Sequence, residues 1–274
     1  LPIFALVSIG YDPETITEQS PEIMPLGLKT MPVSDIEVDF PAIRDMHEAS
    51  SLTSLAEVNS WSKDAIIAER PSPSGVTYPT EPYTDGNAPT DSIETVIIRR
   101  GSARKFSREP IAFAGLSTIL ENAASAIPSD FLTAQSPSLN QIYLIVNSVD
   151  GLQPGSYAFH RDSKMLELIR QGDFRNEAGR LGLGQPLAAD ASVNVYFMAD
   201  LETILTVYGN RGYRVAQLEA SITAGRIYIG AYALGMGATG LTFYDDAVTQ
   251  FFSPNAHGQS VMFLVTVGIP ARRR

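Results

Sequence analysis

The fold is decided by the stretch Arg99-Arg100-Gly101-Ser102-Ala103-Arg104-Lys105-Phe106, which Pro110-Ile111 follows. A helix-like pattern ends here, and several cations and a hydroxyl follow within six residues. Arginine side chains bind phosphate oxygens two at a time, and a serine hydroxyl adds a further hydrogen bond. The stretch therefore predicts a site for one phosphate group. A solvated basic helix end that complements the helix dipole has the same composition and remains the alternative.

The composition indicates a globular chain and excludes several classes of site. The chain has 274 residues, of which 44% are hydrophobic and 18% are charged. A formal net charge of −10 argues against a nucleic-acid partner. No cysteine is present, and the three histidines lie far apart, so we expect no disulfide, no iron–sulfur cluster and no metal site. No apolar run reaches membrane-spanning length, so we expect no membrane partner and, by default, a cytoplasmic location.

The chain divides into an irregular part, residues 1–91, and a regular part, residues 92–274. In the first part, residues 3–9 read as a strand and residues 40–61 as a helix, with Ile43 and Met46 as buried positions. Five prolines between residues 71 and 89 indicate a linker or an extended arm. We therefore predict an N-terminal extension with a proline-rich linker, followed by one folded domain.

Helix and strand patterns alternate in the second part. Asp91 can cap a first helix, with Glu94 placed for a capping box. We then expect a helix over residues 114–124, a strand over 142–146, a hairpin of 157–159 with 165–169, a strand over 193–198, a long helix over 213–236 and a last strand over 261–267. The long helix is dense in small residues. It should pack very closely against a neighbour, and we place it at the core of a subunit interface.

Residues 2–10 and residues 260–268 resemble each other. Leu6, Val7 and Gly10 match Leu264, Val265 and Gly268 at equivalent positions. Two buried strands that share a composition would show this similarity. A tandem duplication, of which only the last strand of the first copy remains, would also show it.

Four motifs, in order along the chain, resemble the nitroreductase-like flavoproteins, and three of them the SagB-type dehydrogenase branch of that group. They are Arg100-x-Ser102-x-Arg104-x-Phe106, Asp150-Gly151-Leu152-Gln153-Pro154-Gly155-Ser156-Tyr157, Tyr208-Gly209-Asn210-Arg211-Gly212-Tyr213-Arg214, and the run from Ala233-Leu234-Gly235-Met236-Gly237-Ala238-Thr239-Gly240 to Asp245-Asp246. Each motif is loose alone, but four in the right order are fairly specific. The resemblance covers residues 92–270.

The resemblance implies an α+β fold, a three-layer sandwich with a central, mostly antiparallel sheet flanked by helices, in an intertwined dimer. It also implies FMN at the dimer interface, with Arg100, Ser102 and Arg104 on the phosphate and ribityl chain. We expect the loop at Thr239, Gly240 and Leu241 to offer backbone donors to the flavin ring, because glycine allows a close approach. Alternatively, Gly235, Gly237 and Gly240 only end the long helix and turn the chain. Residues 1–61 resemble the tail of a preceding copy, so the partner is a second such copy or another protomer.

The chain departs from the branch at several places. The glycine-rich serine segment before the strand at Tyr143 is absent, although Ser138 and Asn140 can still bond a flavin. Azoline-oxidising members carry Lys-Tyr where this chain has Val207-Tyr208, so their proposed base is missing. Tyr208 alone is a weak candidate for a proton donor and is otherwise a core aromatic.

Two further arginines have open roles. Arg226 lies in the middle of the long helix, where it can reach a flavin phosphate or a substrate acid, or extend outward to solvent. Arg272 follows the last strand, where related enzymes place a basic residue on the FMN phosphate. It is equally well explained as part of a disordered tail.

These observations favour an FMN-dependent oxidoreductase that transfers hydride or electrons between NAD(P)H and a small organic acceptor: a nitroaromatic, a quinone or a peptide-derived molecule. The missing motifs motivate a second hypothesis, a degenerate copy with a structural, dimerising role and little or no catalysis. A flavin-storing or flavin-cleaving protein is the third.

Overall fold

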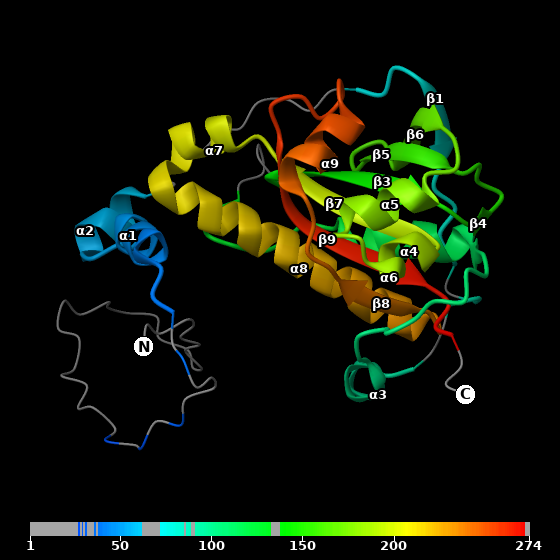
Figure 1. Cartoon of the computed structure of the whole chain (residues 1–274), viewed down its shortest axis with the longest axis horizontal. Coiled ribbons are helices and arrows are strands. Elements are labelled where there is room, and N and C mark those ends of the chain that lie inside the picture. The colour runs from blue at the N-terminus through cyan, green and yellow to red at the C-terminus, as the bar shows by residue number, and fades with distance from the viewer. Residues whose placement is uncertain are drawn as a thin grey trace.

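Seven strands form one sheet in the computed structural model of the chain, which describes residues 27, 29, 31, 36, 38–61, 72–84, 86–88, 91–132 and 138–271 (Figure 1). Every neighbouring pair is antiparallel. Across the sheet the order is β1 (Val76–Pro79), β6 (Met165–Gln171), β5 (Gly155–His160), β3 (Asn140–Val146), β7 (Val193–Ala199), β9 (Ser260–Gly268) and β8 (Gly237–Gly240). A separate parallel pair joins β2 (Ile111–Ala112) to β4 (Val149–Asp150).

Helices cover both faces of this sheet, which explains why its central strands are apolar at successive positions. On β3, Ile142 and Leu144 belong to the hydrophobic cluster of α4 (Phe113–Ala123) and α8 (Gly212–Ala233). The alternate residues Tyr143 and Ile145 pack with α5 (Arg175–Leu181) and α9 (Asp245–Phe252). The expected α+β sandwich with an antiparallel central sheet is confirmed. The structure describes one chain, so the intertwined dimer stays a prediction.

The long helix is confirmed at α8, and its small residues bring it close to α4. A Cβ atom added to Gly230 would lie 3.3 Å from Ile119 Cγ1 of α4. Ala220, Ala224 and Ala231 are buried on the same helix. The small residues therefore serve close packing between two helices of one chain, and the proposed subunit interface stays a prediction.

The predicted single helix over residues 40–61 is wrong. The structure has two short helices instead, α1 (Pro41–Ala49) and α2 (Leu55–Ser60). Ser54 caps α2 by accepting a hydrogen bond from Glu57 N at 3.2 Å, which starts a new helix. Ile43 and Met46 were expected to be buried but are 68% and 39% exposed. The expected strand at residues 3–9 lies outside the described residues.

The segment expected as a linker contains β1, which pairs with β6 at the edge of the sheet. Its proline, Pro79, is the last residue of an edge strand, a position where a missing N–H group is tolerated. Glu167 of β6 fixes the entry to β1 by accepting hydrogen bonds from Ser74 N at 3.0 Å and Gly75 N at 2.7 Å. The sheet therefore begins before residue 92.

The remaining helices are short. Ser92 caps α3 (Ile93–Arg99) by accepting a bond from Thr95 N at 3.4 Å. The predicted cap, Asp91, instead pairs with Arg99 at 2.7 Å. The others are α6 (Pro186–Asp190), α7 (Leu201–Tyr208) and the 3₁₀ turn η1 (Gly209–Arg211). Among the described residues, no helix has the length and apolarity that a bilayer crossing requires.

Candidate functional site

The segment between α3 and β2 holds its basic residues on the outside. Ala103 and Phe106 are buried, and Ala103 N donates to Ala238 O of β8 at 3.0 Å. The side chains at positions 100, 102 and 104 are exposed, and so is Lys105.

An open groove of about 860 Å³ runs beside this segment. Its walls come from α3, from residues 100–102, from the end of α4 and from the middle of α8. Its lining includes Ile93, Arg100, Ser102, Ser221, Gly225 and Arg226. The groove thus unites two of the predicted phosphate ligands with a helix face that the sequence had singled out for its small residues.

Arg100 is the arginine of this segment that lines the groove. Its neighbour Arg99 is engaged twice, through an ion pair with Asp91 and a hydrogen bond to Tyr232 O at 2.9 Å. The side chains of Arg100 and Ser102 have no hydrogen-bond or ion-pair partner among the described residues. A guanidinium and a hydroxyl that face the same groove can together bind a phosphate group.

Arg226 lies in the wall of the groove and also caps α4. Its Nη1 donates to Ala123 O, in the last turn of α4, at 3.4 Å and to Ser125 O, just beyond the helix, at 2.6 Å, and its Nη2 donates to Ala126 O at 3.2 Å. Carbonyl groups at a helix end carry partial negative charge, and a cation placed there stabilises the helix. These partners are neutral, so the full positive charge of Arg226 remains on the groove wall.

Gly225 leaves space at the middle of the groove. A Cβ atom built there meets no heavy atom within 4 Å. A larger side chain on this exposed turn of α8 would occupy the groove itself. The space, two cations without carboxylate partners and a free hydroxyl fit a flat, phosphorylated cofactor such as FMN.

The predicted loop after α8 has its backbone donors occupied. Gly240 N donates to Tyr228 Oη at 2.5 Å, and Leu241 N donates to Leu264 O at 3.1 Å. Thr239 is buried in β8, and its carbonyl accepts a bond from Thr266 Oγ1 at 3.1 Å. Tyr228 itself lines the groove, so a ligand that displaced its hydroxyl would expose Gly240 N. The role of this loop toward a flavin stays a prediction.

Ser138 and Asn140 are buried, and neither lines the groove. Asn140 Nδ2 donates to Ala216 O at 2.9 Å and to the carboxylate of Glu219. Glu219, which is fully buried in α8, also pairs with Arg161 at 3.2 Å. Asn140 therefore anchors the start of β3 to α8, and its proposed role in flavin binding stays untested.

The remaining candidates lie apart from the groove. Tyr208 is 2% exposed, and its hydroxyl donates to Phe131 O at 2.6 Å, as expected for a core aromatic. Burial raises the pKa of Tyr208, which keeps the hydroxyl protonated at neutral pH. Arg104 is exposed on the basic segment and does not line the groove. Arg272 lies outside the described residues.

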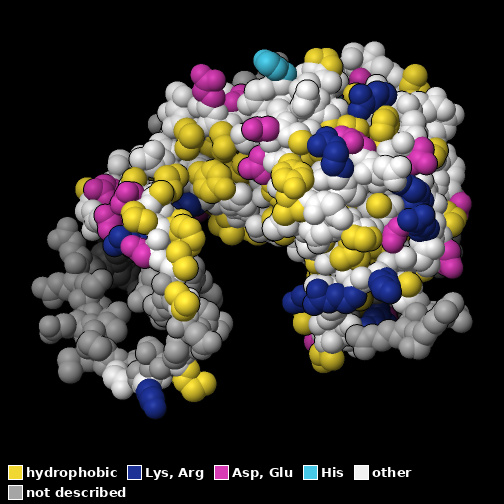
Figure 2. All heavy atoms as spheres, in the orientation of Figure 1, with side chains coloured by type: hydrophobic (Ala, Val, Ile, Leu, Met, Phe, Trp, Pro, Cys, Tyr) yellow, Lys and Arg dark blue, Asp and Glu magenta, His cyan; other side chains and the backbone are white. Residues whose placement is uncertain are grey.

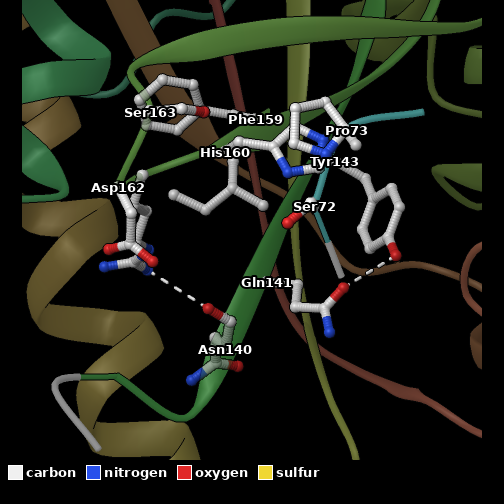
Figure 3. A pocket seen from close by; sticks show the side chains of 12 residues that line it. Ser72, Pro73, Asn140, Gln141, Tyr143, Phe159, His160, Asp162 and Ser163 are labelled. Atoms are coloured by element: carbon white, nitrogen blue, oxygen red, sulfur yellow. Dashed lines mark hydrogen bonds between the residues drawn. The ribbon is translucent and has the colours of Figure 1, made fainter. Parts of the chain in front are cut away.

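A smaller cavity of about 130 Å³ lies at the start of β3 and the end of β5 (Figure 3). Figure 3 shows Gln141, Tyr143 and His160 around it. Tyr143 Oη donates to Gln141 Oε1 at 2.9 Å, and His160 Nε2 bonds Glu167 at 2.8 Å. Burial raises the pKa of Tyr143 to about 12, so this hydroxyl stays neutral. Asn140 is the one cofactor candidate that lines this cavity, so we do not assign the cofactor to it.

Within the described residues, no three His, Asp or Glu side chains come together in a way that would hold a metal ion. The groove instead offers cations, hydroxyls and apolar side chains. Its chemistry is the binding of an anionic or phosphorylated organic molecule.

Comparisons with known proteins place this fold in context. The model named "Nitroreductase family" matches residues 97–269. A protein of Methanocaldococcus jannaschii, named as a nitroreductase, is 29% identical over 164 residues, which make up 58% of this chain and 82% of that protein.

Two solved structures share the fold. A protein from Anabaena variabilis, described as a nitroreductase, superposes with a TM-score of 0.70 at 24% identity and covers 84% of this chain and 47% of its own. The present chain therefore spans about half the length of that protein. The E. coli microcin synthetase McbBCD complex with truncated pro-MccB17 bound gives a TM-score of 0.55 at 16% identity, over 85% of this chain and 93% of that chain.

The sequence did not point to several lining residues of the groove. Asn122 and Ser125 reach it only because α4 ends beside the middle of α8. Their residue types carry no local signal for a binding site. Gly225 could have been noticed as one of several small residues in α8, but only the structure shows which of these positions is open to solvent.

Proposed function

The chain belongs to the nitroreductase family, and we propose that it is an FMN-dependent oxidoreductase of the SagB-type branch. It would transfer hydride or electrons between NAD(P)H and a small organic acceptor, for which a nitroaromatic, a quinone or a peptide-derived molecule are the candidates. The observation that carries this proposal is the groove, where Arg100 and Ser102 lie at one end, with no side-chain partner in the described part of the chain, and Arg226 lies at the other.

In this proposal, Arg100 and Ser102 bind the phosphate through charge-assisted and neutral hydrogen bonds. The open turn of α8 at Gly225 supplies the surface against which a flat ring lies, and Ile93 covers it from α3. Bound FMN would supply the redox chemistry by accepting a hydride and passing electrons on in the same site. The protein groups position both reactants and keep charge complementary to the phosphate.

The experiment is the visible absorption spectrum of the purified protein, followed by identification of the chromophore released on denaturation. Flavin bands with FMN released would support the proposal and justify a screen of NAD(P)H oxidation. Arg100→Ala should weaken FMN binding by about 1–3 kcal/mol, because it removes a charge-assisted pair. An unchanged FMN affinity in that variant would refute the phosphate assignment.

A second candidate is a degenerate copy with a structural role. The observations that favour it are the engaged backbone donors of Gly240 and Leu241 and the burial of Asn140 away from the groove. A colourless protein that takes up no added FMN would select this hypothesis.

We also propose that the working form is a pair of such folds, either two protomers or two copies in one longer chain. The length of the Anabaena structure, about twice that of this chain, supports this idea. Exposed apolar side chains support it as well. They include Ile36, Val38, Phe40 and Ile43 before and within α1, and Ile93, Ile97 and Ile98 on α3.

A further inference from the structure

A second compartment adjoins the groove at the end of α4. It measures about 310 Å³ and shares the lining residues Asn122 and Ser125 with the groove, so the two spaces adjoin there. Its other walls are Glu121 of α4, Phe159 at the end of β5, and Arg161 and Lys164 from the β5–β6 turn. The basic segment that carries Arg100 and Ser102 does not line it.

The compartment lies at the end of the groove away from Arg100. Arg99 bonds Tyr232 O near the end of α8, whereas Arg226 bonds Ser125 O earlier along that helix. Between Ser221 and Ile229, which both line the groove, α8 rises by about 12 Å. A phosphate bound by Arg100 therefore leaves the far end of the groove and the adjoining compartment open to a second ligand.

This far end is rich in positive charge although the whole chain carries a net charge of −10. Three cations and one carboxylate lie at this end: Arg161, Lys164 and Arg226 against Glu121.

The buried Glu219 balances Arg161, and Glu121 pairs with Lys164 at 2.7 Å. Among the described residues, the hydrogen-bond partners of Arg226 are all neutral groups. After these pairings, one uncompensated cation stands at the junction of the two spaces.

Among these cations, Lys164 is the one whose side chain can most easily change its partner. Its side chain is 64% exposed, and an ion pair at such a site contributes little, because solvent screens it. Glu121 has a second partner, Thr80 Oγ1, at 2.5 Å, so it keeps a hydrogen bond when Lys164 turns away. Lys164 can therefore turn toward an anion that enters beside Arg226.

We propose that the compartment binds an anionic group, a carboxylate or a phosphate, of the second substrate, with Lys164 and Arg226 as the residues that select it. This inference rests on the proposed function, because it places the anion next to the cofactor groove. Two sources share this chemistry: the acid group of the electron acceptor and a phosphate of the dinucleotide donor.

The test compares 4-nitrobenzoate with 4-nitrobenzamide, which have the same shape and differ in charge. Calorimetry measures the binding of each compound to the whole protein, with and without added FMN. Wild type should bind the acid more tightly than the amide by about two- to fivefold, the range of a partly exposed ion pair. Lys164→Gln should remove this preference, and Glu121→Gln should increase it, because that change frees the lysine.

Arg44→Gln is the matched control, since Arg44 is 65% exposed and pairs with Asp39 on the distant α1. A loss of NADPH affinity in Lys164→Gln, with no acid preference in wild type, would identify the dinucleotide phosphate as the source. Equal binding of acid and amide, with unchanged NADPH affinity in every variant, overturns the proposal. A protein that binds no FMN but prefers the acid in a Lys164-dependent way refutes the proposed function alone.

Discussion

At the scale of single residues, substitutions of Gly225 should affect the stability of the fold and ligand binding in the groove differently. Glycine in a helix costs about 0.5–1 kcal/mol relative to alanine, and nothing in the structure opposes a Cβ atom there. Gly225→Ala should therefore raise the melting temperature of the cofactor-free protein. Gly225→Leu fills the groove and should weaken FMN binding at least about tenfold, or ~1.4 kcal/mol. FMN titration of both variants, followed by fluorescence, checks this. Tight FMN binding by the leucine variant would show that the cofactor does not bind against this turn of α8.

Tyr208 tests whether a buried hydroxyl does chemistry or holds the core together. Its hydroxyl bonds Phe131 O, and its ring lies 5.8 Å from the ring of Trp61, centroid to centroid. Tyr208→Phe should lower the free energy of unfolding by about 1 kcal/mol, the value of a typical buried hydrogen bond. We expect kcat with NAD(P)H to stay within about twofold. A large fall in kcat with an unchanged free energy of unfolding would instead support the hypothesis that Tyr208 is a proton donor.

At the scale of elements, Arg226 joins α4 to α8. Arg226→Gln keeps polarity but removes the charge and most donors from the end of α4. Its removal should cost about 1–2 kcal/mol of unfolding free energy, as for other charge-assisted bonds and helix caps. Urea denaturation measures this, with Arg180→Gln, which pairs only with Glu177 on its own helix, as the control. Equal stability of the two variants would show that the cap contributes nothing.

Glu167 fixes the edge strand β1 and makes its attachment depend on pH. Burial raises the pKa of Glu167, but hydrogen bonds from Ser74 N, His160 and Gly75 N outweigh burial and hold this pKa below its ordinary value. A carboxyl group with a lowered folded-state pKa stabilises the fold above its unfolded pKa of about 4.3, and this contribution is lost as pH falls through the folded pKa.

Glu167→Gln should therefore cost about 1–2 kcal/mol at pH 7 and less at about pH 3, below the unfolded pKa of about 4.3, where the stabilising contribution of the charge declines. Urea denaturation at the two pH values measures the difference. Glu81→Gln, at an exposed position that makes no hydrogen bond or ion pair with the described residues, controls for the charge change. An equal cost at both pH values would show that the charge of Glu167 does not hold β1.

The same elements show what the sequence can predict. Strand β3 and helix α8 were predictable, because uninterrupted apolar or small residues define them locally. The motif that contains Arg100 and Ser102 was also visible in the sequence, because both residues lie within one short segment. The hydrogen bond between Arg226 and Ser125 joins residues 101 positions apart in the sequence. The hydrogen bond between Asn140 and Glu219 joins residues 79 positions apart. Such contacts depend on tertiary packing, which leaves no local pattern in the sequence.

At the scale of the whole molecule, residues 38–61, which contain α1 and α2, form an arm that projects from the body of the fold (Figure 1). Figure 2 shows hydrophobic side chains along this arm and a hollow between it and the body. The arm carries Val38, Phe40 and Ile43, which are 66%, 59% and 68% exposed. Hydrogen bonds attach it near the start of α8, where Arg211 donates to Ser50 O at 3.1 Å and Arg214 donates to His47 O at 3.0 Å. Trp61 Nε1 also donates to Tyr208 O, at the end of α7, at 3.2 Å. Exposed apolar side chains that gather on one segment indicate a partner surface.

We therefore expect the arm to pack on a second copy of this chain. Light scattering after gel filtration should give twice the chain mass for wild type at micromolar concentration. Phe40→Asp combined with Ile43→Asp should give the single-chain mass, because burying a carboxylate without a partner costs several kcal/mol. Glu48→Gln on the same helix should leave the mass of the dimer unchanged. Circular dichroism would establish that the double variant keeps its fold, since these side chains contact solvent in the single chain. A wild-type protein of single-chain mass would contradict this expectation.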